Sequence, residues 1–185
     1  MKKFFIAIMA IATLSIVSCN KEEEKTADNT SIEKQDSIPT GNQDSISIEG
    51  RWDAPRFADN PNDIAFVAIF AGENLDLYII AWGQHYVGTY TMTDGTINYN
   101  ITEAYQAYTD VAYDGEGKMI SWSWNAGNLD AATLTLSEGF GWYTMNEEDF
   151  NSYKANLDEF GFNINGTTAS SSLFGIPDLI FHKVQ

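Results

Sequence analysis

A two-residue alternation of polar and apolar side chains is the feature that most constrains how this chain can fold. Residues 96–102 alternate without exception, and residues 120–125 and 132–137 repeat the pattern. Successive side chains of a β-strand point to opposite faces, so such alternation is typical of strands with one buried face. Turn residues, as in 72–74 and 93–95, separate the candidate strands at intervals of about 8 to 12 residues. The pattern therefore predicts an all-β domain built as an up-and-down antiparallel sheet.

Two of the candidate strands differ from the rest in their composition. Residues 64–71 and 75–82 are predominantly apolar at both odd and even positions, which indicates central strands covered on both faces or a wall that faces a ligand. A shorter extra strand is predicted at 140–145. The eight main strands are predicted at about 46–53, 64–72, 75–82, 85–93, 96–104, 118–125, 131–137 and 178–184.

A single helix is predicted between residues 146 and 160. Asn146 can cap its start, the acidic residues 147–149 suit the positive end of the helix dipole, and Gly161 can end it. The apolar side chains of this segment fall on one stripe, so we expect the helix to lie against the β-domain or to close one of its ends, as a structural lid or as a gate for a ligand. This stripe consists of Phe150, Tyr153, Leu157 and Phe160.

The start of the chain has the composition of a secretory signal peptide. Lys2 and Lys3 precede the apolar run 4–17, which as a helix would span roughly 20 Å, against roughly 30 Å for the core of a bilayer. The tetrad 16–19, Ile-Val-Ser-Cys, resembles the lipobox of bacterial lipoproteins, in which cleavage precedes the cysteine and lipids are attached to it. The resemblance implies lipidation of Cys19 and a membrane anchor; the alternative is an uncleaved signal with an incidental cysteine. Cys19 is the only cysteine, so an intrachain disulfide is excluded.

Polar residues continue the chain as a spacer. Residues 19–47 contain too little apolar surface to offset the entropy of ordering, which predicts a disordered tether between the signal peptide, residues 1–18, and one domain at 48–185. The run 20–25, Asn-Lys-Glu-Glu-Glu-Lys, resembles the surface-export signal of lipoproteins in one large phylum of Gram-negative bacteria. That resemblance implies an outer-membrane protein displayed at the cell surface; the alternative is the periplasmic face.

Two short repeats lie inside this tether. The tripeptide Asp-Ser-Ile occurs at 36–38 and again at 44–46, and it resembles the acceptor of an O-glycosylation system in the same phylum. The resemblance implies glycosylation of Ser37 and Ser45.

The start of the domain resembles the Gly-x-Trp signature that opens the lipocalin fold, through Gly50 and Trp52. In that family the Trp fills the closed end of the barrel, and a basic residue of the last strand lies over its ring. Lys183 takes that position here, where lipocalins have Arg. Residues 87–97 are also similar to a hairpin of bacterial lipocalin-like lipoprotein domains. The resemblance implies an all-β fold, an eight-stranded antiparallel up-and-down barrel, lipocalin-like, with one amphipathic helix before the last strand.

The charge balance and the motif content exclude or disfavour several classes of function. The chain carries a formal charge of −16, opposite to what a nucleic-acid-binding protein needs. The sequence contains no phosphate-binding Gly loop, no His-x-x-Glu-His zinc motif and no Ser nucleophile elbow. We therefore expect a binding protein and not an enzyme, with no cofactor.

The remaining polar candidates are read as solvated surface. The loops 59–63 and 110–116 collect acidic side chains, but neither has the ligand spacing of an EF-hand. His85 and His182 are the only histidines, and we expect both at the surface or at the rim of the barrel. No metal site is predicted.

Aromatic residues are the sequence feature that points to a ligand. Tyr and Trp have a flat apolar face and one polar tip, which suits a pocket for an amphipathic molecule or a sugar, although the same rings can simply fill a barrel core. If Trp82 and Tyr86 face inward, one arrangement would place Trp122 and Trp124 opposite them across a cavity. The candidate ligand-binding residues are Trp82, Tyr86, Tyr90, Tyr99, Trp122 and Trp124.

Two functions remain open on the sequence. In the first, a monomeric barrel holds a small hydrophobic or amphipathic ligand, and an unfilled interior would favour it. In the second, the domain is a protein- or glycan-interaction module with a filled core, for example an inhibitor of a basic enzyme. Both place the protein at a membrane through its lipid anchor.

Overall fold

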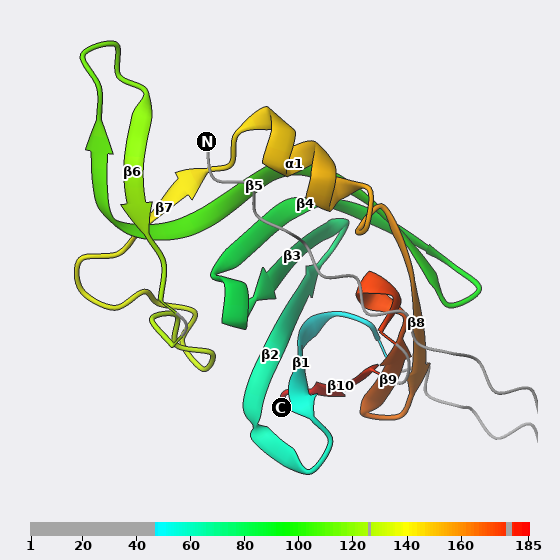
Figure 1. Cartoon of the computed structure of the whole chain (residues 1–185). Helices are drawn as coiled ribbons and strands as arrows, with labels where there is room; N and C mark the ends of the chain where they lie inside the picture. The colour runs from blue at the N-terminus through cyan, green and yellow to red at the C-terminus, as the bar shows by residue number, and fades with distance from the viewer. Residues whose placement is uncertain (1–46, 126, 177–178) are drawn as a thin grey trace, which may run out of the picture. The chain divides into compact units, whose positions relative to one another are not determined.

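Eight antiparallel strands close into a barrel in the computed structural model, which describes residues 47–125, 127–176 and 179–185 (Figure 1). The first five barrel strands pair in chain order, and the last three complete the ring back to the first strand. The barrel strands are β1 (Gly50–Phe57), β2 (Asn60–Ala71), β3 (Asn74–Ile79), β4 (Gln84–Thr93), β5 (Thr96–Tyr113), β8 (Glu159–Asn165), β9 (Thr168–Ser171) and β10 (Leu179–Lys183).

The prediction of an all-β, eight-stranded antiparallel barrel with one late helix is confirmed. The helix, α1 (Glu147–Lys154), lies between the short strand β7 (Gly141–Thr144) and β8, ahead of the last three strands. Predictions for the first 46 residues, including Cys19, Ser37, Ser45 and the tether up to that point, fall outside the described residues. No helix in the described part of the chain has the length and apolar character needed to cross a bilayer.

The strand predicted at 118–125 exists but does not belong to the barrel. It forms β6 (Met119–Ser123), which pairs with the far end of β5. The two strands make an arm that stands away from the barrel (Figure 1). The short strand predicted at 140–145 corresponds to β7, which also pairs with β5.

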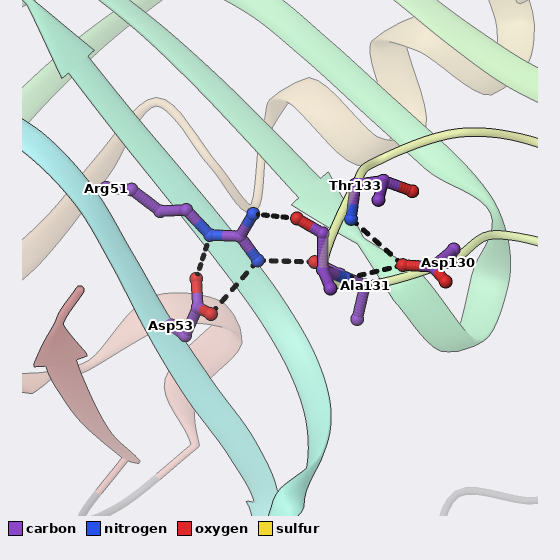
Figure 2. Close-up of polar contacts among 6 residues, drawn as sticks. Arg51, Asp53, Asp130, Ala131 and Thr133 are labelled. Atoms are coloured by element: carbon purple, nitrogen blue, oxygen red, sulfur yellow. Dashed lines mark hydrogen bonds and ion pairs between the residues drawn. The ribbon is translucent and has the colours of Figure 1, made fainter. Parts of the chain in front are cut away.

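The prediction of a strand at 131–137 is wrong. This segment forms turns with one isolated bridge, because the Asp130 carboxylate accepts hydrogen bonds from the backbone N–H groups of Ala132 and Thr133, at 2.8 and 2.9 Å (Figure 2). Such a local side-chain bond competes with strand pairing. These two hydrogen bonds also lower the pKa of Asp130, and the bond from Thr133 contributes most. Leu134 has a φ of 57°, which a strand does not allow.

The predicted helix is also shorter than expected. It begins after Asn146, whose side chain caps it by accepting a hydrogen bond from the Asp149 backbone at 2.9 Å, but it ends at Lys154. Phe160 instead lies in β8 and pairs with Ile97 of β5. The apolar residues assigned to one helical stripe are therefore shared between the helix, a turn and a barrel strand. Pairing with β5 satisfies the backbone of this segment as well as burying its side chains.

Aromatic rings fill the barrel interior at the end where β1 begins. Trp52 is fully buried, and its ring lies edge-on to Phe162 with centroids 5.4 Å apart. The Lys183 ammonium lies 5.4 Å from the Trp52 ring centroid, and the indole N–H donates to a backbone carbonyl at 2.7 Å. Gly50 has a φ of +106° and lies beside the Lys183 stem. Gly50, Trp52 and Lys183, considered as barrel-closing residues, thus lie together at this end.

A second apolar layer covers the outer face of β2 and β3. Residues 124–125 and 127–140, which link β6 to β7, fold back over these strands, and Leu129 and Leu134 pack against Val67 of β2. This layer explains why the two strands are apolar on both faces: they are covered on both sides.

Arg51 fastens this layer to the barrel. Its guanidinium donates to the carbonyl oxygens of Ala131 and Ala132, the second at 2.6 Å, and it forms an ion pair with Asp53 at 2.7 Å (Figure 2). The planar, forked guanidinium suits such a set of acceptors. One barrel side chain thereby holds a segment about 80 residues away in the sequence.

Candidate functional site

Three of the six candidate aromatic residues belong to the packed body of the barrel. Tyr86 and Tyr99 are buried, and their hydroxyl groups donate within the protein: Tyr86 to the Gln84 side chain at 3.0 Å, and Tyr99 to two backbone carbonyls at 2.9 Å. Burial raises the pKa of both phenols far above its usual value. Tyr90 is partly buried and packs edge-on against Phe70 at 5.0 Å. Tyr86 and Tyr99 therefore contribute mainly to the core.

Trp82 and Trp124 lie together at the other end of the barrel. A short 3-10 helix, η1 (Ile80–Trp82), joins β3 to β4 there, and both indoles line a hollow of about 490 Å³ that we call the mouth. Trp122 lies apart from them, half exposed on the arm, where it lines a separate groove of about 680 Å³ beside α1. The structure therefore brings two of the three tryptophans to one site.

Gly83 sets the position of the Trp124 ring. Its φ of +60° is a left-handed conformation that favours glycine, and an added Cβ would lie 2.4 Å from the nearest Trp124 ring atom. The Trp124 indole N–H donates to the Ala81 carbonyl at 3.4 Å, and its ring is perpendicular to Phe140 with centroids 5.9 Å apart. Trp82, by contrast, is 48% exposed. The mouth thus combines one fixed indole with one that solvent reaches.

Two glutamines that sequence reasoning missed also line the mouth. Gln84 of β4 and Gln106 of β5 are cross-strand partners. Gln84 is only 3% exposed, and its Oε1 accepts from the Tyr86 hydroxyl. The Gln106 Nε2 donates to the backbone carbonyls of Trp82 and Gly83, at 2.6 and 3.2 Å. Each glutamine therefore uses one end of its amide within the protein.

The opposite ends of these two amides make no such bond. Gln84 Nε2 and Gln106 Oε1 have no hydrogen-bond partner among the described residues, whereas every fully enclosed side-chain polar atom in that part of the chain has one. Gln84 Nε2 is therefore not fully enclosed by the described residues, and the mouth is the hollow that Gln84 lines. The mouth is thus lined by one unpaired donor and one unpaired acceptor on cross-strand partners.

Tyr153 of α1 completes the wall of the mouth. Its ring lies 6.4 Å from Tyr86, and with Phe150 it packs against the barrel core. Tyr153 and Gln106 also line the groove beside the arm, so the two hollows adjoin. The acidic residues 147–149 lie on the rim of that groove, so the negative charge lies beside the mouth and not in it.

The sequence indicates an inward-facing side chain more clearly for Gln84 than for Gln106. Gln84 precedes the inward-facing Tyr86 by two positions, so strand alternation already indicates a polar side chain inside the barrel. A bulge in the pairing near Val87 shifts the alternation of β5 before Gln106. Such a shift has no clear mark in the sequence.

The other polar candidates lie away from the mouth. The His85 Nε2 lies 2.7 Å from the Asp76 carboxylate, and its ring stacks on Tyr78 with centroids 3.9 Å apart. His182 is exposed on β10. The segment 59–63, predicted as an acidic loop, is mostly exposed, but from residue 60 on it belongs to β2. No group of three metal-ligating side chains occurs in the described ranges.

Comparison of the chain with protein-family models, with curated proteins and with solved structures finds no match in any of the three. The fold itself is an eight-stranded antiparallel closed barrel with extra strands. Closed barrels of this size serve as frames for ligand sites at their mouths and in their interiors.

Proposed function

We propose that this protein binds a small amphipathic ligand at the mouth of its barrel and does not catalyse a reaction on it. The unpaired donor of Gln84 and the unpaired acceptor of Gln106, in a hollow that Trp82 and Trp124 also line, carry this proposal. A ligand site typically combines apolar walls with a few placed polar groups, and this hollow has both.

The packed interior supports binding at the mouth over binding deep in the barrel. At the closed end the rings of Trp52, Phe70 and Phe181 all lie within 5.4 Å of Phe162, and buried side chains continue the core toward the mouth. A ligand that replaced these rings would disrupt the close packing of the core. In this proposal the lipocalin-like character of the barrel lies in its closed end, and the ligand occupies the opposite end.

We further propose that the protein acts as a monomeric, lipid-anchored barrel on the outer membrane, displayed at the cell surface. Cys19 would carry the lipids, and residues 20–47 would hold the barrel away from the bilayer. Metabolic labelling with an alkyne fatty acid tests the anchor: the wild-type chain is expected to be labelled, and Cys19→Ser is expected to lose the label. Labelling of Cys19→Ser would contradict it.

A second candidate function has a specific observation in its favour. The groove beside the arm combines the exposed Trp122 with the acidic rim 147–149, which suits a basic protein partner. Such binding would weaken steeply with salt, whereas binding in the uncharged mouth would not.

Native mass spectrometry of the full chain, isolated from the cells that produce it, tests ligand binding at the mouth. We expect an adduct that is lost on denaturation and is absent from Trp82→Leu. Trp122→Leu removes an equally exposed indole outside the mouth and is expected to keep the adduct. A bare mass after incubation with an extract of those cells would contradict the proposal, and so would an adduct unaffected by Trp82→Leu.

A further inference from the structure

We infer that the ligand of the mouth is a neutral saccharide, held through two neighbouring hydroxyl groups; this inference rests on the function proposed above. Gln84 Nε2 can donate to one hydroxyl oxygen, and Gln106 Oε1 can accept from the next hydroxyl. Cross-strand partners have side chains about 4.5–5.5 Å apart at Cβ, so their amides reach adjacent groups of one ring. Each sugar hydroxyl both donates and accepts, and two adjacent ones therefore match this pair.

The walls of the mouth suit a sugar ring as well. A pyranose has apolar C–H faces between its polar edges, and flat aromatic faces are the natural contact for them. Trp82 and Tyr153 can provide such faces, while Trp124 is fixed against Gly83 as a rigid side wall. The volume of about 490 Å³ lies within the usual range of about 300–1,000 Å³ for ligand pockets.

A hydrocarbon chain would fit this hollow poorly. It would cover the buried Gln84 amide without offering its Nε2 an acceptor, and an unpaired buried polar group weakens binding by about tenfold or more. The barrel core, which a chain would have to enter to avoid this, is occupied by packed rings.

Charge further narrows the class of saccharide. The residues that line the mouth carry no formal charge: Ala81, Trp82, Gln84, Gln106, Trp124 and Tyr153. Glu147 and Glu148 lie on the rim of the adjoining groove, so they would repel uronic acids and sulfated sugars. A neutral hexose or N-acetylhexosamine is therefore the class that the site favours.

The test is a titration of the ¹⁵N-labelled full chain, followed through the side-chain amide resonances of Gln84 and Gln106. The sample is held in a zwitterionic detergent, because sugar-based detergents would compete. Probes are neutral hexoses, N-acetylhexosamines and their disaccharides, with a medium-chain fatty acid as the lipid comparison. We expect at least one neutral saccharide to shift both resonances, independently of salt. Trp82→Leu is expected to weaken this binding about tenfold, and Trp122→Leu to leave it unchanged.

Monodeoxy analogues of the best saccharide then locate the contact without altering the protein. Loss of either of two adjacent hydroxyls should weaken binding about tenfold, and loss of any other should not. If the fatty acid shifts the Gln84 resonance and no saccharide does, the saccharide inference is overturned while ligand binding at the mouth stands. If saccharides shift other resonances only, the inference also fails. If no probe shifts Gln84 and native mass spectrometry shows no adduct, both proposals fail.

Discussion

Replacement of Tyr86 by Phe isolates the hydrogen bond that orients the amide of Gln84. The Tyr86 hydroxyl donates to Gln84 Oε1 at 3.0 Å, and both residues are buried. Phe has the same ring and removes only the hydroxyl, so packing against Tyr153 is kept. Rotating the Gln84 amide cannot compensate, because the rotated amide would turn its nitrogen toward the ring of residue 86, where Phe has no acceptor.

The expected magnitude follows from burial. A net hydrogen bond contributes about 1 kcal/mol, and leaving a buried acceptor unpaired adds its desolvation penalty, which gives a loss of about 1–3 kcal/mol in the free energy of unfolding. Tyr105 provides the matched control, because its hydroxyl contacts Glu103 at the surface. The substitution Tyr105→Phe is expected to change stability by less than about 0.5 kcal/mol.

Urea denaturation followed by tryptophan fluorescence measures both variants. The denaturation midpoint should fall for Tyr86→Phe at an unchanged slope, because the surface exposed on unfolding is the same. Equal midpoints for Tyr86→Phe and Tyr105→Phe would refute the reasoning. Gln84 would then not be held by Tyr86, and the argument that its nitrogen is free in the mouth would lose its basis.

Three further outcomes are expected. Gly83 and Gly72 both have a φ near +60°, but an added Cβ meets Trp124 only at Gly83. Gly72→Ala should lower the free energy of unfolding by about 1 kcal/mol through backbone strain, and Gly83→Ala should lower it further and shift the tryptophan emission. Burial, and next to it a nearby carboxylate, raises the pKa of Tyr78 from 10.0 to about 12. Between pH 10 and about pH 12 the unfolded chain has therefore lost a proton that the folded chain keeps. Stability measured in urea should therefore fall as pH rises above 10, and a flat profile would contradict this. Arg51→Gln should speed hydrogen exchange in the segment that covers β2 and β3 and leave exchange in the barrel strands unchanged. Equal exchange rates of that segment in the wild type and in Arg51→Gln would contradict this.

The barrel could be predicted because its information is local. Strict alternation at 96–102 specifies one buried face, and the turns specify short connections between neighbouring strands. The segment 131–137 shows the same alternation and fails, because the Asp130 side chain bonds to the backbone that a strand would have used. Phe160 fits a helical stripe equally well, and only its pairing with Ile97 decides for a strand. The local sequence pattern thus predicts the type of fold, and side chains that compete for backbone hydrogen bonds determine whether an individual strand forms.

The mouth could be predicted only in part, because its components lie on segments that the barrel pattern does not place. Trp82 and Trp124 are conspicuous in the sequence, but their meeting depends on a glycine with room for a ring against its backbone. Trp122, only two residues away from Trp124, faces a different groove. Composition can therefore indicate that tryptophans matter, while the site that they form depends on contacts across about 40 residues of sequence.

The two glutamines explain how a barrel with a packed interior would hold the binding site proposed at its mouth. Rings close to Phe162 and Trp52 fill the closed end of the barrel, and the hydroxyl groups of the buried Tyr86 and Tyr99 bond within the protein. At the mouth the inward-facing positions become Gln84 and Gln106, and each amide is half used by the protein: one by the Tyr86 hydroxyl, the other by the backbone of η1. The bonds that fix the amides also decide which end of each is free. Specificity at the proposed site would thus follow from the hydrogen bonds that the barrel makes to its own polar groups at this end.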